Sequence, residues 1–249
     1  LDFYHAQGYP VPSVIEYLMT LLNSNFEEWR MKNPTEDVKK FNFTTKKMSV
    51  SGSLFDVDKL KDVSKNTIAV MDAETVYNYV ADWAKSYDEE FYQLLSRDPA
   101  YAQSIFAIGR GGKKPRKDIA IWSEVKDYMG FFYDELFHPE YEFPANVSKE
   151  DTLTILEKYQ SLYDETMDMN TWFETICKLS GEIGFATSTK EYKANPEAFK
   201  GNPGDTSMVL RVAVSGRQNA PDMYSVMQIL GKDRVIRRMQ QAYDFVKNN

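Results

Sequence analysis

Apolar residues at helical spacing run through most of this chain. In the longest stripe they recur every three or four residues, as on one face of an α-helix: Val76, Val80, Trp83, Tyr87, Phe91, Leu94 and Leu95. Shorter stripes of the same kind occupy residues 14–22, 122–136, 153–159, 173–183, 223–230 and 235–243. The pattern predicts a mostly α-helical protein in which these faces form the core.

Residue types at the ends of several stripes predict where helices begin and stop. Asp151 lies three residues after Ser148, the spacing of a capping box. Asn170 is an expected N-cap for the stripe that follows it. Pro221 suits a first helical turn, and Gly231 suits a C-terminal stop.

Only two stretches favour an extended backbone, residues 41–51 and residues 209–214. The second contains three β-branched valines, Val209, Val212 and Val214. Neither stretch alternates apolar and polar residues well enough to build a sheet. We therefore predict an all-α fold with at most a short hairpin.

Composition excludes several classes of function. The 30 basic and 37 acidic side chains give a formal charge of −7, so the whole chain has no general attraction for nucleic acid or for an anionic membrane. A single cysteine, Cys177, allows no internal disulfide and fits a reducing cytoplasm. The two histidines, His5 and His138, make no spaced metal motif, and no metal site is expected. A start without Met or an apolar leader suggests a piece of a longer chain.

The charges are unevenly spread along the chain. Residues 134–174 hold eleven acids against two lysines. The first of two basic clusters contains Arg110, Lys113, Lys114, Arg116 and Lys117. The second contains Arg211, Arg217, Lys232, Arg234, Arg237, Arg238 and Lys247. Because salt screens charges beyond about 8 Å, each cluster can attract a polyanion despite the net negative charge, although a solvated charged face explains it equally well.

Two short motifs are similar to nucleotide-binding loops but lack essential features. The glycines and Lys113 in residues 109–113 do not have phosphate-loop spacing, and Pro115 follows where a helix should begin. Residues 47–51 resemble the lysine loop of class I aminoacyl-tRNA synthetases, but Val50 occupies the place of its second lysine. Neither motif predicts catalysis, and no other cluster of residues in the sequence does.

A collinear series of segments resembles bacterial glutamyl-tRNA synthetases downstream of their true lysine loop. The matching segments are 2–10 (DFYHAQGYP), 15–23 (IEYLMTLLN), 51–60 (SGSLFDVDKL), 210–216 (LRVAVSG), 221–224 (PDMY) and 230–234 (LGKDR). The third is similar to the family's S-x-A-x-F-D-x-x-K-L and the fourth to its L-R-x-A-L-T-G. Each segment alone is modest, but their order spans nearly the whole chain.

The resemblance implies an elongated helical region without the catalytic domain. A stem-contact domain is expected over residues 1–70, and two helical anticodon-binding parts over residues 71–145 and 146–249. The parent would join glutamate to its tRNA with ATP and magnesium. This fragment would need no cofactor, would be inactive alone, and would bind tRNA(Glu) as a cytoplasmic monomer, without a membrane or DNA.

The resemblance also assigns candidate tRNA-binding residues in the second cluster. Arg211 matches an arginine that lies at the anticodon in the family, and Ala220, Pro221 and Met223 match positions that pack against its bases. Ala220 replaces a threonine common there, which removes a hydroxyl group. Our own inference from the local sequence adds Gln218 and Asn219 as hydrogen-bonding groups, and Arg217 belongs to the same cluster.

In the first cluster, the run from Arg110 to Lys117 precedes the stripe that begins at Trp122, where the family's tRNA-facing basic residues occur. We expect Arg116 and Lys117 nearest the anticodon loop and Lys113 and Lys114 on phosphates. The run is longer and more basic than the family's usual form.

Other functions compete with this interpretation. A non-catalytic helical adaptor whose basic clusters meet an acidic protein fits the composition equally well. A self-contained enzyme lacks residues for chemistry, and a glutaminyl-specific relative is disfavoured because its anticodon region is typically a β-barrel. The sequence leaves open whether glutamate and glutamine tRNAs are distinguished.

Overall fold

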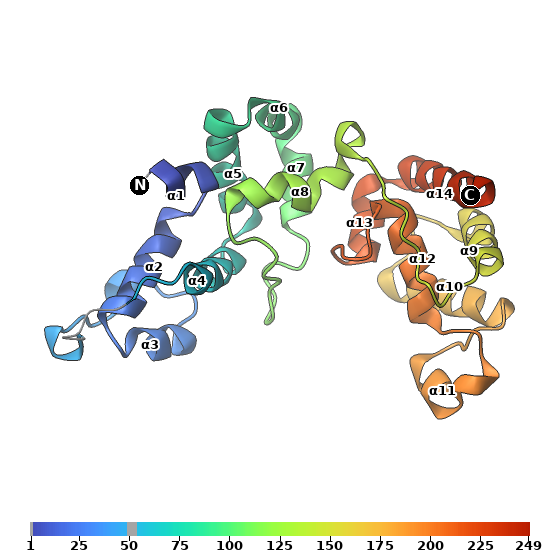
Figure 1. The fold of residues 1–249 in the computed structure, drawn as a ribbon, viewed down its shortest axis with the longest axis horizontal. Helices are drawn as coiled ribbons and strands as arrows, with labels where there is room; N and C mark the ends of the chain where they lie inside the picture. Colours follow the sequence, from blue (N-terminus) through green and yellow to red (C-terminus); the bar gives the residue numbers. More distant parts are fainter. Residues whose placement is uncertain (1, 49–53) are drawn as a thin grey trace. The chain divides into compact units, whose positions relative to one another are not determined.

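A computed structural model describes residues 2–48 and 54–249, and Figure 1 shows its fold. These residues form α-helices, short 3₁₀ helices and connecting loops, with no strand among them, so the all-α prediction is confirmed. The chain divides into two compact units, Leu1–Gly130 and Phe131–Asn249. The finer division at residues 70 and 146 stays a prediction.

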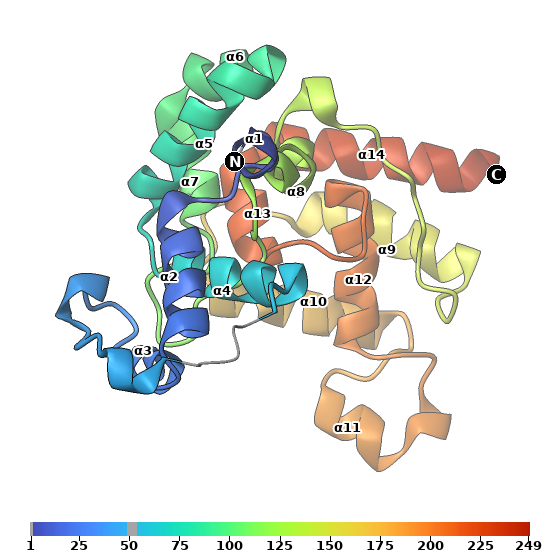
Figure 2. The same ribbon diagram turned by 60° about the vertical axis from the view of Figure 1, so that its left-hand side comes forward.

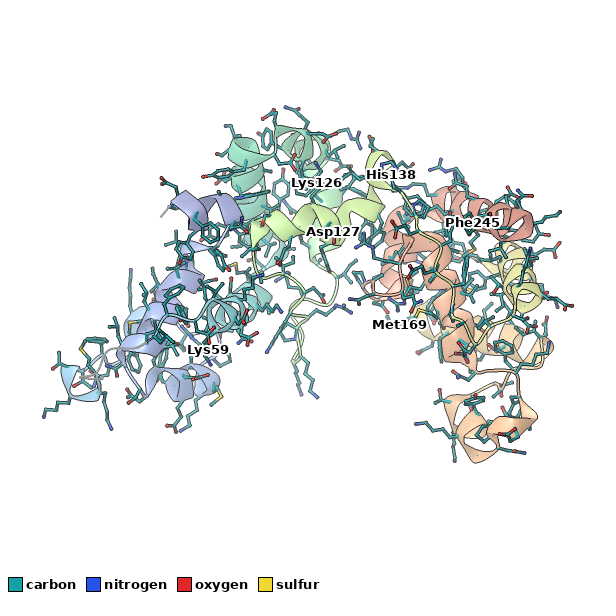
Figure 3. All side chains as sticks on the ribbon, in the orientation of Figure 1. Lys59, Lys126, Asp127, His138, Met169 and Phe245 are labelled. Carbon is teal, nitrogen blue, oxygen red and sulfur yellow. The ribbon has the colours of Figure 1, made fainter. Side chains whose placement is uncertain are left out.

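Eight α-helices lie in the described residues of the first unit, 2–48 and 54–130. They are α1 (Asp2–Gln7), α2 (Val11–Leu22), α3 (Phe26–Lys32), α4 (Val57–Ala69), α5 (Ala73–Tyr87), α6 (Glu89–Arg97), α7 (Pro99–Phe106) and α8 (Val125–Met129). Helix α2 packs against α4, and α5 packs against α6 and α7 (Figure 1). Between α2 and α4, the fully buried Tyr17 and Leu60 contact Tyr9 and Ile121. Lys59 of α4, labelled in Figure 3, forms an ion pair of 2.6 Å with Glu27 of α3.

A glycine joins the start of the chain to the segment before α8. Gly8 has φ 79°, and its carbonyl accepts a 2.9 Å hydrogen bond from the Trp122 backbone N–H. A Cβ atom at Gly8 would lie 2.6 Å from Cβ of Trp122. Glycine is therefore favoured at position 8 for two reasons: the backbone has a positive φ, and a side chain would clash with Trp122.

The long stripe of residues 76–95 forms two helices. Asp88 ends α5 and begins α6, where its side chain accepts a 3.0 Å hydrogen bond from the Phe91 backbone N–H. Val76 and Val80 of α5 and Phe91 and Leu95 of α6 are fully buried. Much of the stripe is therefore core, as predicted, but Tyr87 is 51% exposed next to the capping Asp88.

The second unit contains six further α-helices. They are α9 (Lys149–Leu162), α10 (Met169–Glu182), α11 (Thr189–Ala194), α12 (Pro203–Ser215), α13 (Met223–Leu230) and α14 (Lys232–Asn248). Helices α9, α12 and α14 pack side by side, α10 packs on α9 and α12, and α13 packs on α14. Figure 2 shows α11 at one end of this unit.

Two helix-end predictions are confirmed and two are wrong. Ser148 caps α9 by accepting a 3.0 Å hydrogen bond from Asp151, and Gly231 ends α13. The cap of α10 is Asp168 rather than Asn170, since Asp168 reaches the N–H group three residues ahead. Pro221 precedes α13 instead of lying in its first turn.

Residues 209–214 are helical, so the extended expectation for them is wrong. They lie inside α12, and Val209, Val212 and Val214 are fully buried. Burial of the helix on several sides outweighs the β propensity of the valines. In the other stretch, residues 41–48 contain only the 3₁₀ helix Thr45–Lys47, and residues 49–51 lie outside the described part.

Residues 122–136 form short pieces instead of one helix. They are the 3₁₀ helices Trp122–Glu124, Gly130–Phe132 and Asp134–Leu136, with α8 after the first. Phe131, Phe132 and Tyr133 are consecutive and all buried, which a single helical face does not allow. The segment is therefore buried on more than one side of its backbone and does not form the single helix that the stripe predicts.

Candidate nucleic-acid interface

A glycine-rich basic loop connects α7 to α8 in the first unit. We define the basic loop as residues 109–118, and Figure 1 shows this green segment extending away from the helices of its unit. Gly109 and Gly111 have positive φ, and Gly111 and Gly112 at the tip have open space around them. Lys113 and Lys114 follow directly and are exposed.

Arg110 is directed into its own unit. Its Nε donates to the Phe106 carbonyl at 2.8 Å, and its Nη1 donates to the carbonyls of Ile68 and Met71 at 2.6 and 3.1 Å. Burial lowers the pKa of this guanidinium, although an arginine stays charged at any physiological pH. Burial, followed by the charge of Asp118, raises the pKa of the neighbouring Tyr128 to about 12.

Arg116 closes the base of the basic loop. Its backbone N–H donates to the Gly109 carbonyl at 3.0 Å. Its guanidinium forms a bidentate ion pair with Asp118, with Nε–Oδ2 and Nη2–Oδ1 distances of 2.5 and 3.0 Å. Two of the five basic residues of this cluster are therefore engaged with the protein itself.

The lysines of the basic loop have a different environment. Lys113, Lys114 and Lys117 are exposed, and within the described part of the chain they make no ion pair or hydrogen bond. Lys126 of α8, labelled in Figure 3, instead bridges Asp88 and Glu90 at 3.0 and 3.1 Å. The charges presented to solvent by the basic loop are thus chiefly those of its lysines.

The second cluster surrounds the turn between α12 and α13, which we call the α12–α13 turn and define as residues 216–222. Gly216 ends α12 in the left-handed conformation with φ 73°, and its N–H donates to Val212 at 2.8 Å. Asp222 starts α13 by accepting a 2.9 Å hydrogen bond from the Ser225 N–H. Both ends of the turn are therefore fixed by helix caps.

Arg211 spans this turn from α12. Its Nη1 donates to the carbonyls of Ala220 and Pro221 at 2.5 and 3.0 Å. The side chains of Ala220, Pro221 and Met223 are buried. The polar groups of Arg211 and the apolar residues assigned to anticodon bases thus form one packed structure.

The remaining predicted residues of the turn lie nearer to its surface. The guanidinium of Arg217 lies 5.5 Å from the centroid of the Phe131 ring. Gln218 is exposed and donates to the Glu142 carbonyl at 3.0 Å, and Asn219 is exposed. Amide groups of this kind can hydrogen-bond the edge of an RNA base.

The other arginines of the second cluster bind groups of the protein itself, whereas its lysines, Lys232 and Lys247, are exposed. Arg234 donates to the Phe132 carbonyl at 3.0 Å. Arg237 and Arg238 both bind Asp134, at 2.5 and 3.0 Å. Arg238 is 1% exposed and lies 3.8 Å from the Phe137 ring. The groove beside them has a volume of about 620 Å³ and is bordered by Phe245, labelled in Figure 3.

That this chain itself binds neither ATP nor magnesium stays a prediction, and two observations bear on it. No group of three or more His, Cys, Asp or Glu that could hold a metal ion occurs among the described residues. The basic loop also continues into an extended segment rather than a helix N-terminus, so it lacks the backbone cradle of a phosphate loop. We derive no step that uses these groups.

The structure groups the predicted residues within each unit. Arg110, Lys113, Lys114, Arg116 and Lys117 share the basic loop, and Arg211, Arg217, Gln218, Asn219, Ala220, Pro221 and Met223 share the α12–α13 turn and its flanks. The two clusters lie in different units of the chain. Sequence reasoning missed Asp118 and Tyr128, although the acid directly after the basic run was a visible signal.

Helices in the described part of the chain are too short or too polar to cross a membrane.

Relatives include the glutamate–tRNA ligases of Acetivibrio thermocellus and Clostridium perfringens strain SM101. They are 42% identical over 241 and 245 residues, and each match covers 97% of this chain and 44% of the relative. The chain thus spans less than half the length of these proteins.

Solved structures with a similar fold include glutamate-tRNA synthetase from Elizabethkingia anophelis, with a TM-score of 0.63 and 17% identity over 97% of this chain and 42% of that chain. A glutamate tRNA ligase from Elizabethkingia meningosepticum, solved with its amino acid, has a TM-score of 0.62 and 18% identity over 98% of this chain and 43% of that chain. Residues 113–243, more than half of the chain, match the family model described as an anticodon binding domain. The resemblance deduced from the sequence is therefore confirmed, and the chain belongs to the anticodon-binding domain family.

Proposed function

We propose that this chain is the tRNA-binding portion of a glutamate–tRNA ligase and that it binds tRNA(Glu). The observation that carries the proposal is the family match over residues 113–243, which begins within the basic loop and includes the whole α12–α13 turn. The 42% identity to curated glutamate–tRNA ligases supports glutamate as the amino acid of the parent. The remainder of such a parent would supply ATP- and magnesium-dependent glutamate activation, and this portion alone would be inactive.

The two clusters would have different roles in tRNA binding. Exposed lysines neutralise phosphates and release counterions, which gives affinity without sequence information. The α12–α13 turn carries exposed amides on a backbone fixed by caps and Arg211, and unstacked bases of an RNA loop are read by such groups. The basic loop would therefore set affinity, and the turn would set the choice of anticodon.

The proposal also includes a cytoplasmic monomer without a role for DNA or a membrane. The single Cys177 supports a reducing compartment. The formal charge of −7 opposes general binding to DNA.

Filter binding tests this function directly. The 249-residue chain is titrated against purified tRNA(Glu) and against the same tRNA with a swapped anticodon, at two salt concentrations. We expect tighter binding to tRNA(Glu) and weaker binding of both RNAs at high salt. Equal affinity for the two RNAs, or binding that salt does not weaken, would contradict the proposal and favour an adaptor for an acidic protein.

A further inference from the structure

We propose that Arg110, Arg116 and Asp118 are positioning residues that hold the basic loop closed, so that Lys113 and Lys114 face RNA phosphates together. The inference rests on the proposed function and assigns these three residues to the protein side of the interface. It replaces the sequence-based expectation that both arginines contact tRNA. The carboxylate of Asp118 would thereby support RNA binding.

Arg110 fixes the first end of the basic loop. Its guanidinium bonds to carbonyls at Phe106, Ile68 and Met71, which lie at the C-terminal ends of α7 and α4 or just after them. Carbonyls at helix ends lack the usual helical partner, and the Ile68 carbonyl accepts a 3.1 Å bond from the Met71 N–H in addition to the one from Arg110. These bonds use the Nε and Nη1 donors of Arg110 and leave Nη2 for any phosphate contact, which makes a structural role the favoured one.

Arg116 and Asp118 fix the second end. The Arg116 N–H binds the Gly109 carbonyl, and the bidentate pair with Asp118 holds the Arg116 side chain across the base of the basic loop. The chain then enters the core, where Ile119 and Ile121 are buried and Ser64 of α4 donates to the Ala120 carbonyl at 2.6 Å. Both ends are therefore anchored on α4 or beside it.

Gly109 allows this closed arrangement. It has φ 67°, and a Cβ atom there would lie 2.7 Å from Cδ of Arg116. At the tip, a Cβ atom on Gly111 or Gly112 would meet nothing within 4 Å. The base of the basic loop is therefore packed and its tip is open. Because the loop is already closed in the absence of RNA, binding does not have to pay the conformational entropy of closing it.

Charge and positioning make opposite predictions for Asp118. By charge alone, this carboxylate repels phosphate, and its removal should strengthen RNA binding. As a positioning residue, it holds Arg116 in place, and its removal should weaken binding. The sign of one substitution separates the two roles.

The test compares Asp118→Asn with Asp62→Asn in the 249-residue chain. Asp62 is an exposed carboxylate on α4, so the control changes the net charge equally. We expect Asp118→Asn to weaken tRNA(Glu) binding about two- to fivefold, the range that loss of an exposed ion pair allows, and Asp118→Glu to restore part of it. Asp62→Asn should leave binding unchanged or slightly tighter.

Two further readouts separate this inference from the proposed function. Amide hydrogen exchange at Arg116 reports closure without RNA, and Asp118→Asn should accelerate it at least about twofold. In a chain that already carries Lys113→Ala and Lys114→Ala, Asp118→Asn should not weaken tRNA binding further. Unchanged exchange, tighter binding by Asp118→Asn, or the same loss without the lysines would overturn the inference while tRNA binding by the unsubstituted chain still supports the function.

Discussion

The basic loop contains five cations within ten residues, whereas the α12–α13 turn contains one, Arg217, and is spanned by a second, Arg211. In each region an arginine is directed at backbone carbonyls: Arg110 binds three of them and Arg211 binds two. A guanidinium with five donors can hold several carbonyls at once, whereas a lysine at the tip of a loop stays hydrated. The comparison shows an arginine fixing the backbone in each region, and we propose that the exposed lysines of the basic loop are the residues that meet phosphates.

Removal of Arg110 should have the largest effect on stability. Arg110→Ala removes three hydrogen bonds from a charged donor, although the Ile68 carbonyl keeps its bond from the Met71 N–H, and we expect the free energy of unfolding of the first unit to fall by about 3 kcal/mol. Urea denaturation followed by circular dichroism measures this. A loss below about 0.5 kcal/mol would show that Arg110 contributes no more to stability than an exposed lysine, which would contradict its structural role.

Arg211→Ala should cost the second unit about 1.5–3 kcal/mol, because two hydrogen bonds from a charged group are lost. The same variant should lose part of its preference for the correct anticodon, since the backbone of the turn is no longer fixed. Denaturation and filter binding on one preparation measure both effects. A stable variant that weakens cognate and swapped tRNA equally would remove Arg211 from anticodon recognition.

Gly109→Ala should destabilise the first unit by about 1–2 kcal/mol, because an alanine is strained at φ 67° and crowds Arg116. Gly112→Ala is the matched control, since its Cβ would meet open space. The control should leave stability unchanged or raise it by up to about 1 kcal/mol. Equal effects of the two substitutions would contradict a packed base below an open tip.

The double substitution Lys113→Ala and Lys114→Ala should change stability by less than about 0.5 kcal/mol, since both side chains are exposed. It should reduce the slope of log K against log salt for tRNA binding by about 1.4–1.8, the value for two lost phosphate contacts. A salt series of filter-binding measurements gives the slope. An unchanged slope would show that these lysines do not contact phosphates.

The smallest expected effect is on stability in acid. Arg110 and Arg211 bind backbone carbonyls, which do not titrate, whereas Arg237 and Arg238 bind the carboxylate of Asp134, which does. Burial alone would raise the pKa of Asp134, but hydrogen bonds from Arg238 and Arg237 outweigh it and lower the pKa below its ordinary 3.8. The stabilisation is therefore complete above pH 3.8 and lost as pH falls through the folded-state pKa. Asp134→Asn should flatten the pH dependence of unfolding in this range, and a curve unchanged by the substitution would contradict the ion pairs.

The sequence predicts the helices better than it predicts the site. Ser148 and Gly231 mark helix ends correctly because capping depends on a few neighbouring residues. Val212 and its neighbours are misread because burial in α12 depends on helices distant in sequence. For the same reason a basic run does not reveal that Arg110 reaches the end of α4 while Lys113 stays outside.

The central claim is that the basic loop supplies affinity and the α12–α13 turn supplies the choice of anticodon. The most direct test is the ratio of the dissociation constants for swapped-anticodon tRNA and tRNA(Glu), measured in the chain with and without the Lys113→Ala and Lys114→Ala substitutions. The account predicts that both dissociation constants rise by the same factor, so the ratio stays above one and unchanged. A ratio that falls to one when only these lysines are removed would contradict it.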